Sequence, residues 1–230
     1  MDIPEIKGRK IRQSEHIRFC CQRCAECCKH VHEVIPAEAL DIFRMTKHLQ
    51  KTDSTIKLYE DVVDRYLDPV PIDGSGFCML MLKSVGEDDR CIFLEGNRCT
   101  IQSAKPRACR TYPLAIGSEK ERLEYFLCSE RTHHYKGPLI KVRSWVRQTM
   151  NEEDKEFVIA DSKYSVRIAR MLRKVPQDMR KRALLSFLHY RYSDYDLEQL
   201  FMPQYRRKNE QLLAVLQRMI GGNSNEKEYL

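Results

Sequence analysis

Hydrophobic positions recur at helical spacing in two stretches of the first third of the chain. The first stretch carries Ile35, Ala39, Ile42 and Leu49, and the second carries Tyr59, Val62, Val63, Tyr66 and Leu67. Pro36 can open the first helix, because proline fits a first turn. Asp53 or Ser54 can cap the second helix, which Asp68-Pro69 ends. The pattern predicts two consecutive helices that pack as a hairpin over the loops that follow.

The pattern changes between Phe77 and Cys128. The apolar pieces there are short, at residues 77–82, 91–94 and 123–127, and Gly, Asn, Asp and Pro separate them. Such spacing predicts short strands joined by tight turns. A segment this irregular gains little from packing alone, so we expect a bound metal to organise it.

Helical spacing returns after Gly137-Pro138 and continues to Gly221-Gly222. It predicts amphipathic helices over residues 139–150, 157–172 and 179–188. A final pair is expected, a short helix that Ser193 caps and a longer one after Pro203. Methionine and aromatic stripes on such helices are typical of a core, and we assign them no chemistry.

The distribution of cysteine suggests two regions, since all ten cysteines lie between Cys20 and Cys128. The predicted fold class is mainly α, with an irregular, metal-organised, cysteine-rich module that contains short strands, and a C-terminal helical lobe. We expect a metal-binding domain at residues 15–136, a helical lobe at 137–222 and a flexible tail at 223–230.

Composition places the protein in the cytoplasm. The N-terminus lacks the apolar core of a signal peptide, and no segment approaches the ~18 apolar residues of a membrane span. In a reducing compartment thiols favour metals over disulfides. The formal charge is +7, but thiolates around a metal would reduce it. We therefore expect a protein partner, and neither nucleic acid nor a membrane; the sequence leaves the oligomeric state open.

Four cysteines lie within eight residues, at Cys21, Cys24, Cys27 and Cys28. Two-residue spacers let successive thiolates point at one centre, as in the C-x2-C-x2-C run of bacterial ferredoxins. That run's fourth cysteine and its proline are missing here. Further ligands would then come from a downstream group, which consists of Cys91, Cys99, Cys109 and Cys128. Cys20 and Cys78 are interpreted as small buried side chains.

These cysteines resemble the pattern of the YkgJ-like CxxCxxCC cysteine-cluster family, described as zinc- or iron-chelating domains. The family's pattern is C-x2-C-G-x-C-C, then G-x-C-x-F-L, C-x-I-Y and R-P-x-x-C-R-x-[FY]-P, and the match runs from Phe19 to Pro113. The cysteine framework is complete. Ala25, Arg90, Gln102 and Lys105 depart from it, and Ala25 replaces a glycine, which leaves the local turn geometry open.

Eight cysteines suffice for two four-thiolate sites or for one cluster with spare thiols, and we favour one cluster. The compact triple spacing favours iron–sulfur, most simply 4Fe–4S, over zinc. His30 and His32 are interpreted as polar loop residues rather than ligands, and His133-His134 carry less weight still. Arg110 and Tyr112 are expected to hydrogen-bond to cluster sulfur.

Three functions are compatible with this pattern. The first is a cytoplasmic iron–sulfur protein that passes electrons or metal to a partner. The second is a protein lysine N-methylase-like enzyme using S-adenosylmethionine, because flagellin lysine N-methylases resemble the family over the cysteines. Against it, Asp73-Gly74-Ser75-Gly76 is not a nucleotide-binding loop. The third is a zinc-stabilised binding module.

Overall fold

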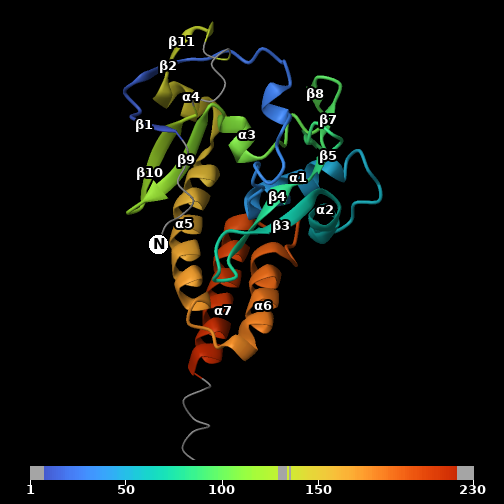
Figure 1. The fold of residues 1–230 in the computed structure, drawn as a ribbon, viewed down its shortest axis with the longest axis vertical. Coiled ribbons are helices and arrows are strands. Elements are labelled where there is room, and N and C mark those ends of the chain that lie inside the picture. Colours follow the sequence, from blue (N-terminus) through green and yellow to red (C-terminus); the bar gives the residue numbers. More distant parts are fainter. Residues whose placement is uncertain (1–7, 129–133, 135, 222–230) are drawn as a thin grey trace, which may run out of the picture.

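The computed structural model describes residues 8–128, 134 and 136–221, which includes every cysteine. It is 46% helical and 19% strand, with short strands and a helical C-terminal region. Short strands and short helices form one end of the molecule, and the three longest helices form the other (Figure 1). The expected tail at residues 223–230 lies outside the described residues.

The predicted helical hairpin is formed by α1 (Ala39–Leu49) and α2 (Tyr59–Tyr66). Helix α1 begins later than Pro36, because the chain first pairs with a strand: the Ala37 N–H donates to the Leu80 carbonyl at 2.9 Å. Helix α2 also begins late, after a turn in which Asp53 accepts the backbone N–H of Thr55. After α2 the chain forms β3 (Leu67–Pro71), which pairs antiparallel with β4 (Cys78–Leu82).

Two tight hairpins carry cysteines at the ends of their second strands. They are β5 (Ser84–Val85) with β6 (Arg90–Cys91), and β7 (Leu94–Glu95) with β8 (Arg98–Cys99). Gly96 in the second turn has a φ of +56°, a conformation that glycine adopts without steric cost. A short helix, α3 (Arg107–Thr111), follows Pro106 and carries Cys109. The predicted short strands of this region are therefore present.

A three-stranded antiparallel sheet stands beside these hairpins. Its order is β1 (Arg9–Ile11), β10 (Arg122–Leu127) and β9 (Leu114–Glu119). A separate pair joins β2 (His16–Arg18) to β11 (Leu139–Lys141), after which α4 (Val142–Thr149) begins. The first three residues of the helix predicted at 139–150 are thus a strand, because they pair with β2.

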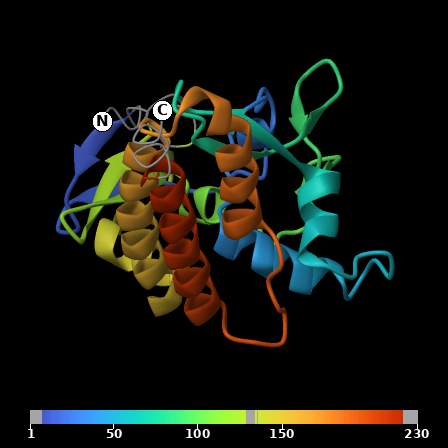
Figure 2. The ribbon, with the colours of Figure 1, turned by 90° about the horizontal axis from the view of Figure 1, so that it is seen from below.

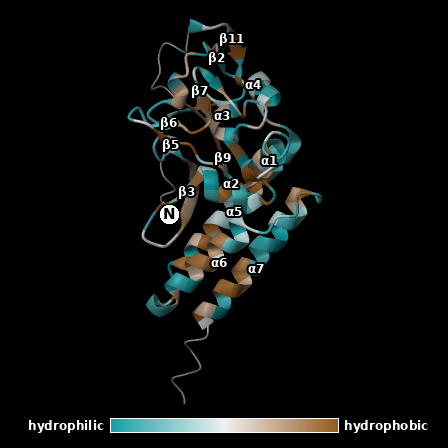
Figure 3. Cartoon of the chain, turned by 90° about the vertical axis from the view of Figure 1, so that its right-hand side faces the viewer, coloured by the Kyte–Doolittle hydropathy of each residue, from teal (hydrophilic) through white to brown (hydrophobic). Residues whose placement is uncertain are grey.

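The C-terminal helices are α5 (Glu152–Leu172), α6 (Arg180–Tyr192) and α7 (Phe201–Gly221). Helix α7 packs against both α5 and α6 (Figure 2). In Figure 3, hydrophobic and hydrophilic residues alternate along α6 and α7, as the amphipathic pattern requires. Aromatic rings fill the core between the helices, and Phe157, Phe187, Phe201 and Tyr205 are each almost inaccessible to solvent.

One prediction for this region is wrong, since residues 193–200 form no helix. The side-chain amide of Gln204 donates to the Asp196 carbonyl and accepts from the Asp196 N–H, both at 2.9 Å, which holds the segment in a non-helical conformation. Pro203 lies inside the first turn of α7, where its missing N–H costs no helical hydrogen bond.

Backbone pairing links the two regions that the cysteine distribution suggested. Strand β2 of the first pairs with β11 of the second, and Ser162 of α5 donates to the Ser118 carbonyl of β9 at 2.9 Å. The division after residue 136 stays a prediction. No helix among the described residues is long and apolar enough to cross a membrane.

Candidate metal centre

All eight cysteines expected to bind metal line one cavity of about 2200 Å³. They come from the loop around residues 21–28, from the hairpins that end at Cys91 and Cys99, from α3, and from the end of β10. Cys20 and Cys78 do not line this cavity. Cys78 is buried in β4 at 4% exposure, and burial raises the pKa of its thiol to about 11. Cys20 is exposed, so the interpretation of Cys20 as a buried side chain is wrong.

The loop that carries the first four cysteines is shaped by left-handed residues. Arg23, Ala25, His30 and Glu33 all have φ between 52° and 62°. Ala25 stands just before a 3-10 turn, Glu26–Cys28, that presents Cys27 and Cys28 side by side. The left-handed conformation costs a non-glycine residue about 1–2 kcal/mol. The geometry therefore explains why glycine is usual at the position of Ala25 in the family pattern.

Five thiols from four separate elements are neighbours. The Sγ atoms of Cys27 and Cys28 are 3.8 Å apart. Their contact and burial of Cys28 raise the pKa of the Cys28 thiol far above its usual range, and Cys109 and Cys91 raise it further. Burial likewise raises the pKa of Cys91, Cys99 and Cys109, and the neighbouring thiols add to the shift.

Four of these thiols form a mutually interacting set. Cys27 acts on the other three, Cys99 acts on Cys91, and Cys109 feels both Cys91 and Cys99. Each pair in the set is thus close enough for one negative charge to disfavour another. Thiolates gathered in this way are costly unless a cation neutralises them, which is the electrostatic signature of a metal site.

Backbone amides and one lysine act in the opposite direction. Hydrogen bonds from the backbone of Phe93 and Ile101 lower the pKa of Cys91 and Cys99, although burial outweighs them. An N–H two residues after a cysteine that points at its sulfur is the arrangement of metal-binding knuckles. The Lys105 side chain lowers the pKa of Cys99 and Cys109 by its charge.

Cys24 lies against a histidine that the sequence pattern did not single out. His134 is buried at 3% exposure, and its Nε2 is 3.3 Å from Cys24 Sγ. Its Nδ1 is 2.8 Å from the Tyr112 hydroxyl. Phe19 packs edge-on against the rings of Tyr112 and His134, which fixes both. Tyr112 is thus one residue removed from sulfur rather than bonded to a cluster thiol, as had been expected. The neighbouring His133 lies outside the described residues.

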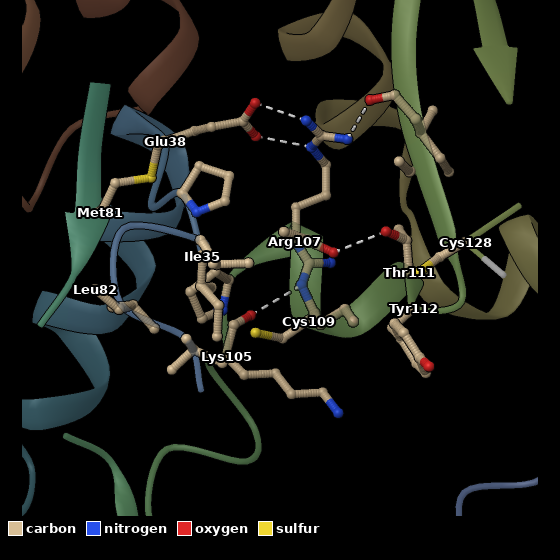
Figure 4. Close-up of a pocket in the computed structure, with 18 of the residues that line it drawn as sticks. Ile35, Glu38, Met81, Leu82, Lys105, Arg107, Cys109, Thr111, Tyr112 and Cys128 are labelled. Atoms are coloured by element: carbon tan, nitrogen blue, oxygen red, sulfur yellow. Dashed lines mark hydrogen bonds and ion pairs between the residues drawn. The ribbon is translucent and has the colours of Figure 1, made fainter. Parts of the chain in front are cut away.

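Arg110 and Arg107 flank Cys109 on α3, and both guanidinium groups are engaged by carboxylates. Arg110 donates to Asp154 at 2.9 and 3.0 Å and to the Thr149 carbonyl at 3.0 Å, instead of to sulfur. Arg107 donates twice to Glu38, at 2.6 and 2.8 Å, and to the Ile116 carbonyl (Figure 4). These contacts tie α3 to α1, α5 and β9, and so they fix the position of Cys109.

The remaining candidates stand at the margins of the site. Cys21 is exposed, and Cys128 is half-buried with its N–H donating to the Pro113 carbonyl at 2.9 Å. His32 is exposed and contacts the Ser84 hydroxyl at 3.2 Å, as a polar loop residue does. His30 lines the cavity, and its N–H donates to the Asp88 carbonyl.

Across the part of the chain that the structure describes, no three His, Cys, Asp or Glu side chains are arranged to hold a single metal ion. The five neighbouring thiols are therefore gathered without converging on one point. Whether all eight cysteines are ligands stays a prediction.

Comparison with known proteins supports metal binding by this segment. The family model CxxCxxCC, described as a "Putative zinc- or iron-chelating domain", matches residues 20–135, half of the chain. The matched region contains all the cysteines, the Arg107–Thr111 helix and His134. Neither the search of curated proteins nor that of solved structures found a match.

Proposed function

Because the chain belongs to the CxxCxxCC family of zinc- or iron-chelating domains, we propose that it holds an iron–sulfur cluster, most simply 4Fe–4S, and passes electrons or metal to a protein partner. The observation that carries the proposal is the set of four mutually interacting thiols, Cys27, Cys91, Cys99 and Cys109. These four would be the ligands, and Cys28 would stand beside them.

The spacing of the thiols supports a cluster over a single zinc ion. Four sulfurs around one tetrahedral zinc, with bonds of about 2.3 Å, lie within about 4 Å of each other. Of this group, Cys27 and Cys28 meet that spacing at 3.8 Å, yet adjacent residues alone cannot complete a tetrahedron. The described thiols form no single-ion site. Thiolates bound to different irons of one cluster lie farther apart, which fits a gathered but non-converging set.

The protein environment of this set suits a redox or delivery role. A cluster would supply one-electron chemistry or labile iron at this place. Cys27 and Cys21 are exposed, so one edge of the site faces the solvent and is accessible to a partner. Lys105 offsets part of the negative charge, and the amides of Phe93 and Ile101 point at sulfur. Both features stabilise the more negative, reduced state of a thiolate-bound centre.

Anaerobic purification followed by iron, sulfide and zinc analysis tests the proposal. The expected protein is brown, with broad absorbance near ~400 nm that bleaches on reduction. Cys27→Ser should lose the iron, whereas Cys78→Ser, a matched substitution outside the cavity, should retain it. Iron retained in Cys27→Ser, or colourless protein with stoichiometric zinc, would contradict the cluster and favour the zinc-stabilised module.

Cys24→Ser distinguishes two versions of the site. If the early C-x2-C-x2-C run supplies several ligands, this variant loses the metal as completely as Cys27→Ser. If the four mutually interacting thiols are the ligands, it retains the metal and loses only the contact with His134.

The lysine N-methylase-like enzyme is a second candidate, and the size of the cavity favours it. About 2200 Å³ exceeds the roughly 300–1,000 Å³ of a common small-molecule site. A rise in melting temperature with S-adenosylmethionine would support this activity. No change at saturating concentration would count against it.

A further inference from the structure

The cavity lined by the cysteines extends to a second end at the long helices. There, α5 contributes residues at spacings of three and four, which places them on one helical face. They are Val158, Asp161, Ser162, Ser165, Val166 and Ala169. None of these residues lies within the segment that the family model matches. This end therefore belongs to the part of the chain that carries no assigned function.

A buried arginine stands in the wall of this end. Arg191 of α6 is 3% exposed and lines the cavity. Its Nη2 donates to Asp161 at 2.6 Å, and its Nη1 donates to Asn209 at 3.3 Å. Its Nε has no hydrogen-bond partner among the described residues, and no other buried side-chain nitrogen or oxygen in that part of the chain shares this condition. An unpaired buried donor costs about 1–3 kcal/mol, which an acceptor on a ligand would relieve.

The surroundings of Arg191 hold it rigidly and are mostly apolar. Its guanidinium carbon lies 5.9 Å from the ring centres of Phe77 and Tyr192, both of which line the cavity. Asp161 is fixed in turn by the Tyr205 hydroxyl at 2.6 Å. Val70, Ile72 and Met79 line the same cavity. Apolar walls with a few convergent polar groups are the usual composition of a small-molecule site.

We propose that this end of the cavity binds a small organic carboxylate with an apolar or aromatic body, whose carboxylate accepts from Arg191 Nε. A charged acceptor is favoured over a neutral carbonyl, because charge-assisted hydrogen bonds are roughly twice as strong. A phosphate needs several donors, whereas Arg191 offers a single unpaired N–H between aromatic rings. The site does not depend on the identity of the metal.

Phenylacetate and hexanoate, each paired with its neutral amide, test this inference by calorimetric titration of the full chain purified anaerobically. We expect saturable binding of at least one acid, about ten-fold or more tighter than its amide. Arg191→Lys keeps the positive charge but lacks Nε, and it should abolish the preference for the acid.

Because Arg191 is buried, a second variant keeps the test independent of its folding. Val166→Phe narrows the cavity from a half-buried position on α5 and should weaken binding at least about ten-fold. Arg170→Phe places the same ring at an exposed position of α5 and should bind as the wild type does. The inference is overturned if neither acid binds the folded wild type, if acid and amide bind equally, or if Val166→Phe binds with unchanged affinity.

Discussion

His134 Nε2 lies 3.3 Å from Cys24 Sγ, although the two residues are 110 positions apart in the chain. The other ring nitrogen, Nδ1, is 2.8 Å from the Tyr112 hydroxyl. If the hydroxyl donates to Nδ1, the ring proton resides on Nε2 and is directed at the sulfur. The histidine then joins the loop of Cys24 to α3, where Cys109 lies.

Removing the Tyr112 hydroxyl should destabilise this link. Tyr112→Phe leaves the buried Nδ1 of His134 without the hydroxyl, at an expected cost of about 1–2 kcal/mol in the free energy of unfolding. Urea denaturation, with metal content measured beside it, gives the value. Tyr190→Phe, on the half-buried side of α6, is the matched control and should change stability by less than about 0.5 kcal/mol. Equal effects of the two substitutions would contradict the link.

Replacing Ala25 by glycine should stabilise the cysteine loop. Ala25 has a φ of +62°, a conformation that glycine adopts without strain. The relief of about 1–2 kcal/mol is partly offset by the greater freedom of glycine in the unfolded chain, so we expect a net gain of roughly 0.5–1 kcal/mol.

The control for that change is Ala37→Gly, a buried position without positive φ, which should destabilise. Thermal denaturation of both variants compares them directly. A less stable Ala25→Gly protein would show that the left-handed geometry does not limit this loop.

Acid should remove the contribution of Asp154. Burial alone would raise the pKa of this carboxyl, but hydrogen bonds from Arg110 and from the Asn151 backbone outweigh it, together with the charges of Arg110 and Arg44, and hold the pKa at about 2. A lowered pKa stabilises the folded state above the ordinary value of about 3.9, and that stability is lost as the pH falls toward 2.

Asp154→Asn should therefore cost about 3–5 kcal/mol at pH 7, because it leaves a partly buried Arg110 unpaired. The difference from the wild type should stay constant down to about pH 4 and shrink below it. Denaturation measured from pH 7 to 3 follows the change. Glu152→Gln, at a side chain 89% exposed, should show neither effect. A difference that is independent of pH would disprove the assigned pKa.

Metal loading should fall as the solution becomes acidic. Burial and neighbouring thiols raise the pKa of Cys91, Cys99 and Cys109, so protons compete with the metal for these sulfurs. Lys105 lowers the pKa of Cys99 and Cys109. Lys105→Gln should therefore move the midpoint of loading to higher pH by about half a unit or more.

Zinc titration of the metal-free chain at fixed pH values measures that midpoint. Lys57→Gln, at an exposed position before α2, should leave it unchanged. A midpoint that moves to lower pH in Lys105→Gln would contradict the electrostatic role of the lysine.

The sequence by itself determined the features that depend on local spacing. The 3.6-residue periodicity predicted α5, α6 and most of α7, because each has an apolar stripe that must be buried. Gly, Asn and Pro between short apolar pieces predicted the hairpins that carry Cys91 and Cys99. The cysteine spacing indicated the family and the chemistry of its donors, since thiols in that pattern are soft metal ligands.

Tertiary structure alone decided which of those groups meet. Periodicity carries no information on contacts between distant segments, so the sequence could not reveal that Cys27 lies beside thiols from three other elements. For the same reason His134 passed as a polar loop residue and Arg110 was assigned to sulfur, whereas the fold buries the first against Cys24 and pairs the second with Asp154. Long-range packing also extended the cavity to Arg191, a residue that its local sequence marks only as part of a helix.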